Sequence, residues 1–555
     1  MKPKRFWFYL LFAILLAACT PEGKISGLIV DENGNVLQDA VVRIKGTNNS
    51  TISDQQGAFT LSGVERGKAV FVTAWVKGYF INGINGLIAG DKGIIIELHA
   101  HSMIDNPAYQ WMMSTAQQGI GEDQGCAACH SSENGEIDFA LPVDEWLLDA
   151  HAQSAINMRF LSMYNGTDLD GNQSPLTRYG YTRDYGSFPL RPDRELAYNG
   201  PGYKLDFPDS AGNCATCHTP LSALDQPYAV DPNQLSGVEL EGINCDFCHK
   251  VWDVTLDPQT QLPYENQPGV LSMEFLRPPE GHQFFAGPLD DVAPGEDTFV
   301  SIQNESAFCA SCHYGVFWNT PIYNSYGEWL DSDYSDAENG QTCQDCHMPQ
   351  TSATYFALPE QGGIARDPQT IFSHQMTGAS DPELLQNAVT MQSEVRQQGD
   401  RIIVDIKIVN DKTGHSVPSD SPLRQMILIV QVVDENGQRL SLTEGPVLPD
   451  WTGVGEAEDG YYAGLPGKGY AKILQEIWTG ISPSGAYWNP TRILSDTRLE
   501  AMQTDTSRYV FSAIDQAAVT VQIKLIYRRA FIELMDQKSW DVPDIIMEEE
   551  IYYLK

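Results

Sequence analysis

Ten of the eleven cysteines and five of the eleven histidines in this 555-residue chain fall into one repeated pattern, Cys-x-x-Cys-His. The five copies are Cys126/Cys129/His130, Cys214/Cys217/His218, Cys245/Cys248/His249, Cys309/Cys312/His313 and Cys343/Cys346/His347. Two thiols at this spacing can add to the two vinyl groups of one haem, and the histidine that follows can reach its iron. A random chain of this composition would hold about 0.004 such motifs, so five copies indicate covalent haem attachment at each.

Two other uses of paired cysteines fit the pattern less well. A disulfide framework would need further thiols, but only Cys19 lies outside the motifs. Structural zinc sites pair two Cys-x-x-Cys motifs and need no histidine directly after each of them. We therefore expect five covalently bound c-type haems, each containing iron, and electron transfer as their chemistry.

The remaining histidines are candidates for the second axial ligand of each iron. Five irons with two histidine ligands each would need the five motif histidines and five of the other six, which are His99, His101, His151, His282, His374 and His415. We expect only one of His99 and His101 to serve. His101 is preferred because it lies nearer the motifs, and which of the two is a ligand stays open. Each of these histidines could instead be an ordinary surface residue, and methionine is an alternative axial ligand.

The first residues resemble a bacterial lipoprotein signal. Residues 1–18 combine basic residues, a short apolar run and small residues, and Leu16-Ala17-Ala18-Cys19 resembles a lipobox. The resemblance implies export, cleavage before Cys19 and lipidation of its thiol, hence attachment to a membrane at its periplasmic face or at the cell surface. Thr20 favours the outer membrane where one exists. The alternative is an ordinary signal peptide with a leftover cysteine.

The charge of the chain is strongly acidic, with 73 Asp and Glu against 35 Lys and Arg and a formal net charge of -38. The negative electrostatic field of so acidic a chain argues against a nucleic-acid partner and against electrostatic adhesion to anionic lipid. It is compatible with steering of basic partners, although acidic surfaces commonly serve only solubility.

The positions of the motifs divide the chain into three parts after the signal. Residues 19–98 alternate apolar and polar residues in short runs separated by turns such as Asp31-Glu32-Asn33-Gly34, which predicts a small β-sandwich. The stretch GLIVDENGNVLQDAVVRIKGTNNSTISDQQGAF resembles carboxypeptidase-regulatory-like domains, which implies a transthyretin-like sandwich used as a spacer or adhesion element.

Residues 99–384 hold all five motifs and predict an irregular domain of short helices and loops. The apolar spacing from Val143 to Tyr164 indicates a helical stretch, which would carry His151. The second and third motifs, and the fourth and fifth, are close in sequence, so we expect each of these pairs of haems to be in or near contact.

Residues 385–555 return to strand-like runs, among them 401–409 and 426–433, and predict a second β-sandwich. The fold class is therefore mixed, with a sandwich on either side of a pentahaem domain. The loop Thr413–Ser419 resembles the Gly-His-x-x-Pro loop of C-terminal β-domains in multihaem cytochromes, which implies that His415 reaches a haem; the alternative is an exposed loop histidine.

The middle of the chain resembles the class of multihaem cytochromes that contains the nitrifier tetrahaem cytochrome and hydroxylamine oxidoreductase. The stretches that carry this likeness include EWLLDAHAQSAINMRFLSMYNGTD, GPGYKLDFPDSAGNCATCHTP and FCASCHYGVFWNTPIYNSYGEWL. The resemblance implies electron transfer with redox partner proteins, either other cytochromes or a membrane reductase or oxidase. In some members it implies catalysis on a small inorganic nitrogen or sulfur compound at a haem with an open axial site.

Two features favour an electron carrier over an enzyme. All five motifs end in histidine, whereas pentahaem nitrite reductases attach the active haem through Cys-x-x-Cys-Lys. No tyrosine can be assigned to the crosslink of hydroxylamine oxidoreductase. No catalytic residue is therefore predicted.

Overall fold

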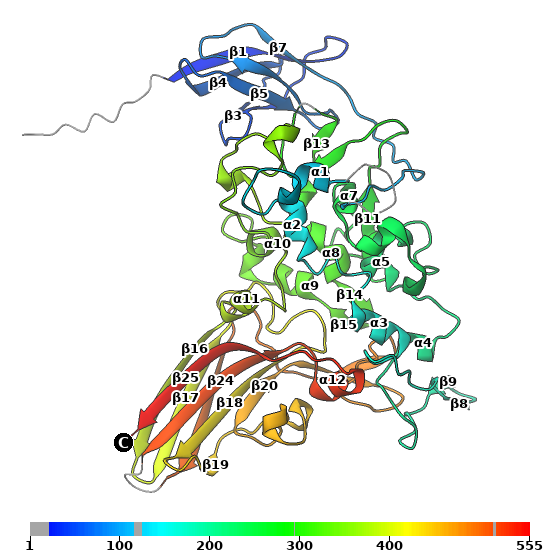
Figure 1. Ribbon diagram of the computed structural model, residues 1–555, viewed down its shortest axis with the longest axis vertical. Helices are drawn as coiled ribbons and strands as arrows, with labels where there is room; N and C mark the ends of the chain where they lie inside the picture. Colours follow the sequence, from blue (N-terminus) through cyan, green and yellow to red (C-terminus); the bar gives the residue numbers. More distant parts are fainter. Residues whose placement is uncertain (1–21, 116–124, 294, 514–517, 555) are drawn as a thin grey trace, which may run out of the picture. The chain divides into compact units, whose positions relative to one another are not determined.

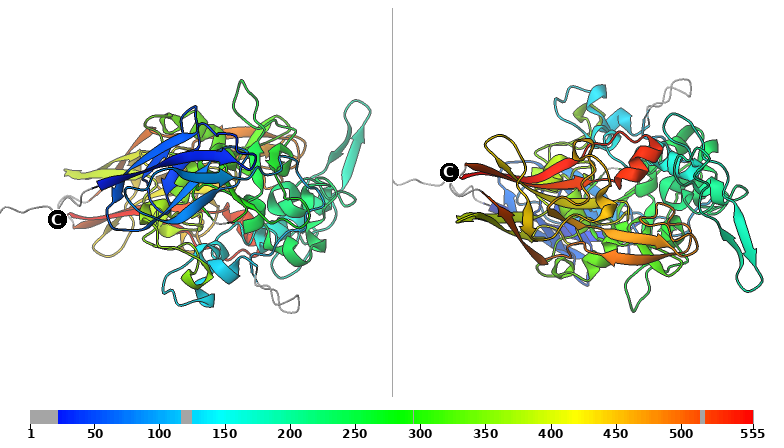
Figure 2. Two further views of the ribbon diagram at one scale, coloured as in Figure 1. Left: turned by 90° about the horizontal axis from the view of Figure 1, so that it is seen from above. Right: turned by 90° about the horizontal axis from the view of Figure 1, so that it is seen from below.

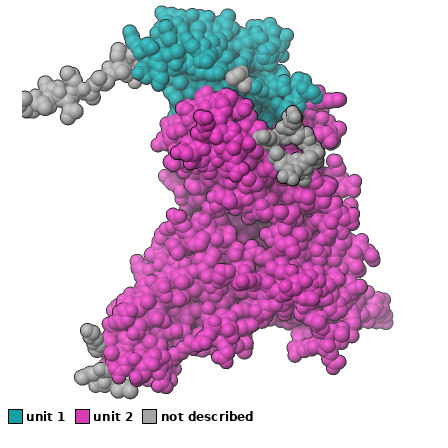
Figure 3. Space-filling view, viewed as in Figure 1, with its two compact units in different colours: residues 1–103, 281–299 teal, residues 104–280, 300–555 magenta. Residues whose placement is uncertain are grey.

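The computed structural model describes residues 22–115, 125–293, 295–513 and 518–554 (Figure 1). The predicted signal sequence and Cys19 lie outside the described residues. The contacts within the chain define two units, one formed by residues 1–103 and 281–299 and the other by residues 104–280 and 300–555 (Figure 3).

Unit 1 consists mainly of two sheets, one mixed and one antiparallel, that share an apolar core. Their strand orders are β4-β1-β7 and β3-β2-β5-β6. The strands are β1 Glu22–Asp31, β2 Val41–Ile44, β3 Ser50–Ile52, β4 Ala58–Glu65, β5 Val70–Trp75, β6 Asn82–Leu87 and β7 Ile94–Leu98. Alternate residues of these strands, such as Ile25, Ile29 and Leu61, are buried between the sheets. The turn after β1 forms because Asp31 accepts hydrogen bonds from the backbone N–H groups of Asn33 and Asn35.

Residues 281–299 belong to unit 1 although they lie between the third and fourth motifs in the sequence. They form the short parallel pair β12 Phe285–Gly287 and β13 Asp297–Phe299. Arg43 on β2 binds Asp290 at 2.6 Å, and the indole N–H of Trp75 on β5 donates to Thr298 at 3.0 Å. Long-range side-chain contacts therefore fix this segment against the N-terminal sheets.

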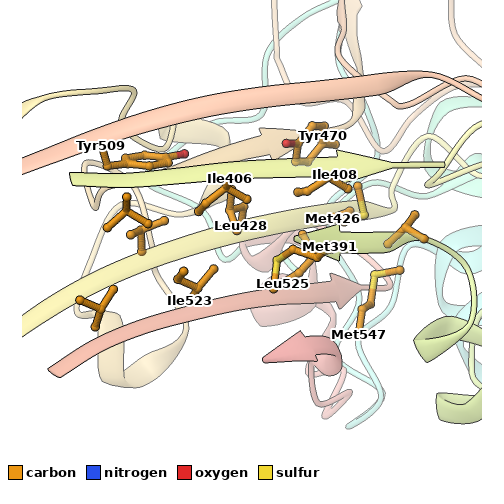
Figure 4. Close-up of a cluster of buried hydrophobic side chains, with 14 of the residues drawn as sticks. Met391, Ile406, Ile408, Met426, Leu428, Tyr470, Tyr509, Ile523, Leu525 and Met547 are labelled. Atoms are coloured by element: carbon orange, nitrogen blue, oxygen red, sulfur yellow. The ribbon is translucent and has the colours of Figure 1, made fainter. Parts of the chain in front are cut away.

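The C-terminal part of unit 2 contains two four-stranded sheets that enclose the largest apolar core (Figure 4). One sheet has the order β16-β17-β23-β19 and the other β20-β18-β24-β25. The strands are β16 Thr390–Gln398, β17 Arg401–Val409, β18 Gln425–Asp434, β19 Leu442–Glu444, β20 Gly467–Tyr470, β23 Thr504–Ser512, β24 Val519–Arg528 and β25 Ile545–Leu554. On β17, Ile402, Val404, Ile406 and Ile408 all point into this core. Burial of each such side chain contributes about 1.5–3 kcal/mol to the free energy of folding. The core is therefore a rigid support for the loops at its ends.

The rest of unit 2 contains short helices, loops and hairpins. Its helices are α1 Ala127–His130, α2 Pro142–Leu147, α3 Met158–Asn165, α4 Tyr203–Asp206, α5 Ala215–His218, α6 Pro220–Ala223, α7 Cys245–Cys248, α8 Ala307–His313, α9 Ser325–Leu330, α10 Cys343–His347 and α11 Pro382–Gln386, and α12 Ile532–Lys538 follows β24. The two-stranded sheets are β8 Tyr179–Thr182 with β9 Gly186–Pro189, β10 Val251–Val254 with β11 Met273–Phe275, β14 Gly315–Phe317 with β15 Thr320–Tyr323, and β21 Lys472–Glu476 with β22 Thr491–Asp496. The β8–β9 hairpin projects from the rest of unit 2 in both views of Figure 2.

The expected arrangement of sheet regions at both ends of the chain and a region rich in helices and loops between them is confirmed. The helical stretch expected from Val143 to Tyr164 is wrong in detail, because α2 ends at Leu147 and α3 begins only at Met158. Asn157 caps α3 by accepting hydrogen bonds from the N–H groups of Arg159 and Phe160, which starts a new helix there. His151 consequently lies in the turn between the two helices. No described residues form a helix of the length and apolarity that crossing a membrane requires.

Candidate haem sites

Each Cys-x-x-Cys-His motif forms about one turn of helix. The backbone N–H of the histidine bonds the carbonyl of the first cysteine four residues earlier in three of the motifs, at 3.0 Å for His130, His218 and His249. Positions i, i+3 and i+4 of a helical turn share one face. The two thiols and the imidazole of each motif are therefore presented together, as attachment of one haem through two thioethers and one axial nitrogen requires.

All ten motif cysteines are free, partly buried thiols in the structure, namely Cys126, Cys129, Cys214, Cys217, Cys245, Cys248, Cys309, Cys312, Cys343 and Cys346. The described residues thus contain no disulfide between these thiols, as haem attachment would require of them. Among the described residues, no group of three or more His, Cys, Asp or Glu side chains is placed to hold a metal ion directly. The thioether bonds at these ten positions therefore stay a prediction.

Several of these thiols lie beside a thiol of another motif. Cys126 interacts with Cys245, Cys217 with Cys312, and Cys309 with Cys343. The first motif is thus next to the third, the second next to the fourth, and the fourth next to the fifth. The expected proximity of the fourth and fifth motifs is present at these thiols. The second and third motifs are also close, because Ala215 of the second packs in one apolar cluster with Phe247 and Cys248 of the third.

The backbone at Cys129 in the first motif is held by a residue outside that motif. The backbone carbonyl of Cys129 accepts a hydrogen bond from the N–H of Leu358 at 2.7 Å, which joins the first motif to the segment after the fifth. The ring of His130, the next residue, is bonded to the carbonyl of Phe356 in that same segment. The structure therefore fixes the backbone at Cys129 from outside its own motif, and attachment of a haem at its thiol remains a prediction.

Hydrogen bonds at Nδ1 orient many of the histidines. Nδ1 of His130 lies 2.7 Å from the carbonyl oxygen of Phe356, and Nδ1 of His347 lies 2.7 Å from that of Thr377. His374 and His415 make the same kind of bond to the carbonyls of Phe372 and Ser416. A ring that donates from Nδ1 keeps its lone pair on Nε2, which is the tautomer that binds a metal through Nε2.

Burial keeps several of these imidazoles neutral. It lowers the pKa of His218 to about 4 and that of His374 to about 4, and it also lowers the pKa values of His130 and His347. A neutral imidazole is the form that ligates iron, so the environment of these rings suits the expected chemistry.

Two pairs of histidine rings have the spacing that one shared iron would impose. The ring centroids are 6.4 Å apart for His347 and His415 and 6.2 Å apart for His313 and His151. Metal–nitrogen bonds of about 2.0–2.1 Å on opposite sides of an ion place two imidazole centroids about 6.3 Å apart. These four residues therefore fit a bis-histidine haem at the fourth motif and another at the fifth.

The environments of these two pairs differ. Nδ1 of His151 lies 2.6 Å from the carboxylate of Asp149, which is buried, and Nδ1 of His313 lies 3.8 Å from that of Asp420. Burial lowers the pKa of His313, but its interaction with Asp420 outweighs burial and the net pKa is raised. His347 and His415, in contrast, face only backbone carbonyls at Nδ1. A carboxylate at Nδ1 makes an imidazole a more basic ligand than a carbonyl does.

His374 lies near the histidines of the third and first motifs. After burial, the main influence that lowers its pKa is the charge of His249, and His130 also contributes. Its backbone N–H donates to Glu145 on α2 at 2.7 Å. His374 is thus near both His249 and His130, and its role as an iron ligand stays a prediction.

His218 of the second motif has a different neighbour. Its ring stacks on that of Phe160, with centroids 3.8 Å apart and an interplanar angle of 3°. Within the described part of unit 2, no histidine ring is paired with it as His151 is with His313. The partly buried tyrosines Tyr323 and Tyr487, with ring centroids 5.6 Å apart, lie near Cys214 of the same motif.

The other predicted ligands belong to unit 1. His101 is buried against Phe80 and Phe284, whereas His99 is exposed beside Glu97. His282 is half exposed, and its Nδ1 lies 2.9 Å from Glu296. Burial thus separates His101 from His99, and whether His101 or His282 binds iron stays a prediction.

Sequence reasoning missed several residues that surround the histidines. Asp149 lies two positions before His151, a spacing that could have suggested a carboxylate partner. Asp420 and Phe160 gave no such signal, because their contacts with His313 and His218 join segments more than fifty residues apart.

No family model and no curated protein matches the chain. Among solved structures, the chain is similar to a penta-haem cytochrome c552 from Thermochromatium tepidum, with 17% identity, 77% of this chain and 97% of that chain covered, and a TM-score of 0.49. It is also similar to part of a type II cohesin–X-dockerin complex from Acetivibrio cellulolyticus, with 22% identity, 15% and 60% coverage, and a TM-score of 0.13. Neither likeness is close enough to carry an argument about this chain.

Proposed function

We propose that this chain is a pentahaem c-type cytochrome that transfers electrons. The observation that carries the proposal is the geometry of the motifs. Each motif presents two thiols and one imidazole from one helical turn, and two of these imidazoles have a second imidazole at the spacing of a shared iron. When bound, haem supplies one-electron chemistry.

The residues of the chain hold and orient the cofactors. The ten motif cysteines would form the thioethers, and His130, His218, His249, His313 and His347 would each bind the iron of their own motif. His151 would be the second ligand at the fourth motif, His415 the second ligand at the fifth, and His374 the second ligand at the third. The bonds at Nδ1 would fix the planes of these rings.

The contacts between motifs support electron transfer through a series of sites. The first motif touches the third, and the second touches the fourth, which touches the fifth. Electrons entering at one motif would pass to its neighbours and leave to a redox partner protein. We further propose that the chain is exported and anchored to a membrane through lipidated Cys19, which would place this series of sites outside the cytoplasmic membrane.

Loss of one attachment site tests the proposal. The double variant Cys343→Ser/Cys346→Ser should bind one haem fewer than the parent chain, measured by intact mass and by the absorbance of the pyridine haemochrome. The matched control Ser373→Ala should keep the parental stoichiometry. An unchanged haem content in the double variant would contradict attachment at this motif.

A second candidate function is oxidoreduction of a small inorganic nitrogen or sulfur compound. The arrangement at His218 favours it, because this motif histidine stacks on Phe160 and has no partner histidine in the described part of unit 2. The reduced protein should then bind carbon monoxide at one haem in five, seen as a change in its absorption spectrum. If no haem responds, the chain is an electron carrier only.

A further inference from the structure

Two arginines meet where β18 and β24 approach the haem region. Gln425 at the start of β18 pairs with Arg528 at the end of β24. The residues just beyond this last pair of the ladder are Arg424 and Arg529. Side chains directly opposite in an antiparallel pair have Cβ atoms about 4.5–5.5 Å apart, and like charges there repel.

A third arginine reaches the same place from α3. Met163 on α3 packs in one apolar cluster with Leu423 and Ala530, the neighbours of Arg424 and Arg529. Arg159 lies four residues before Met163 and therefore on the same face of the helix. The pKa shifts of these arginines agree with this placement. Burial lowers the pKa of Arg159, and the charge of Arg424 lowers it further. Burial also lowers the pKa of Arg529, and the charges of Arg159 and Arg424 add to that effect.

These three guanidinium groups, which we call the arginine cluster, have one counter-ion between them. Arg159 and Arg529 form no ion pair with any described carboxylate, and Nε of Arg529 is shielded from solvent without a hydrogen-bond partner. Arg424 donates to the carbonyl of Ser419 at 3.0 Å and forms an ion pair with Asp420 at 4.0 Å, and Asp420 also faces His313. Carboxylates outnumber basic residues 73 to 35 in this chain, so three arginines that share one carboxylate are unusual. Partly buried charges of one sign are costly unless an anion compensates them.

The arginine cluster lies near the second and the fourth motifs. Arg159 directly precedes Phe160 on α3, and the ring centroid of Phe160 lies 3.8 Å from that of His218. Arg424 lies 4.0 Å from Asp420, whose carboxylate is 3.8 Å from Nδ1 of His313. Guanidinium groups bind two-oxygen anions through paired N–H donors, and three of them can surround one such group.

We propose that Arg159, Arg424 and Arg529 bind a small anionic two-oxygen group beside the Cys214/Cys217/His218 motif. The proposal rests on haem attachment at this motif. The oxygens can come from a propionate carboxylate of the attached haem or from a soluble oxyanion such as nitrite. Both have the charge and the planar shape that the cluster requires.

The test uses the full-length, haem-loaded protein and its Arg159→Gln/Arg529→Gln variant. Arg183→Gln is the matched control, because Arg183 lies on the β8–β9 hairpin and is exposed. Haem content is measured first in each sample, so that loss of haem is recognised as failure of the proposed function. Sodium nitrite is then titrated by calorimetry, and the potentials of the haems are measured between about pH 5 and pH 8.

Each outcome of this test either supports or contradicts anion binding by the arginine cluster. Nitrite affinity at least about tenfold weaker in the double variant than in the control identifies a soluble oxyanion as the ligand. Unchanged nitrite affinity together with a new pH dependence of one haem potential identifies a propionate that has lost its partners. If haem content, nitrite affinity and the pH dependence of all potentials equal those of the control, the proposal is wrong. The Arg159→Lys/Arg529→Lys variant keeps both charges, and it should retain most of the affected property if the double glutamine variant folds poorly.

Discussion

The imidazole rings of His347 and His415 lie nearly parallel, at 10°, with their centroids 6.4 Å apart. His347 ends the turn of the fifth motif, whereas His415 lies in the loop after β17. Asn410, which is fully buried, fixes this loop by donating to the carbonyls of His415 and Leu499. The C-terminal sheets thus position a side chain opposite a motif histidine, which gives them a part in the proposed haem site.

Substitution of His415 by alanine should change the coordination of one haem. Because His415 is the proposed ligand opposite His347, the iron there would lose its sixth ligand and become high-spin. Electron paramagnetic resonance of the oxidised variant should show one new high-spin signal, with the other haems unchanged. His99→Ala, at an exposed histidine, is the control. A spectrum without the new signal would remove His415 from the set of ligands.

Substitution of Asn410 by alanine should loosen the same loop. Two carbonyl groups would lose their donor in a buried site, which costs about 1–3 kcal/mol of unfolding free energy. Urea denaturation measures this loss, and the resonance of the haem at His347 should broaden because His415 is less well held. Asn387→Ala removes an exposed bond to the carbonyl of Glu383 and should change neither property. Equal stability of both variants would argue against this role of Asn410.

Substitution of Asp149 by asparagine should raise the reduction potential of one haem. The carboxylate lies 2.6 Å from Nδ1 of His151 and makes this imidazole a stronger donor to ferric iron. A neutral amide removes that effect, so reduction becomes easier at the haem held by His151 and His313. Spectroelectrochemical titration should show one potential shifted upward, whereas Asp138→Asn, at an exposed carboxylate, shifts none. A downward shift, or none, would contradict the assignment.

The stability of unit 2 should rise with pH through Lys538. Its ammonium group is fully buried and donates to the carbonyls of Ser162, Thr167 and Pro201. Burial lowers its pKa from 10.5 to about 7. Between these values the unfolded chain binds more protons than the folded one, so stability increases as pH rises through this range.

Urea denaturation at two pH values measures this effect. Between pH 7 and pH 9.5 the gain attributable to Lys538 should be about 3 kcal/mol, and it should vanish in Lys538→Met. Lys407→Met, on the outer face of β17, should keep the pH dependence of the parent chain. The same slope in parent and Lys538→Met would refute this assignment.

Local patterns in the sequence were sufficient for some features and not for others. The five motifs and the strand-rich ends could be predicted because spacing and alternation are properties of neighbouring residues. The turn at His151 could not, because the capping of α3 by Asn157 competes with a continuous apolar face. The place of residues 281–299 depends on contacts such as Arg43 with Asp290, which are 247 positions apart.

The distal histidines could likewise be predicted only in part. Counting identified His151, His374 and His415 as candidates, but not which motif each one faces. That assignment depends on how the loop after β17 and the turn after α2 are held, which involves Asn410 and Asp149. Likewise, the arginine cluster arises from strand register and from helix packing, neither of which is visible in a run of residues.

Extraction of the exported protein with acidified organic solvent, followed by haem determination on the protein and on the extract, tests covalent attachment at all five motifs together. Thioether bonds survive this treatment, so the polypeptide should keep its red colour and carry five haems per chain. A colourless polypeptide, with the pigment in the solvent or absent from both fractions, would contradict covalent attachment.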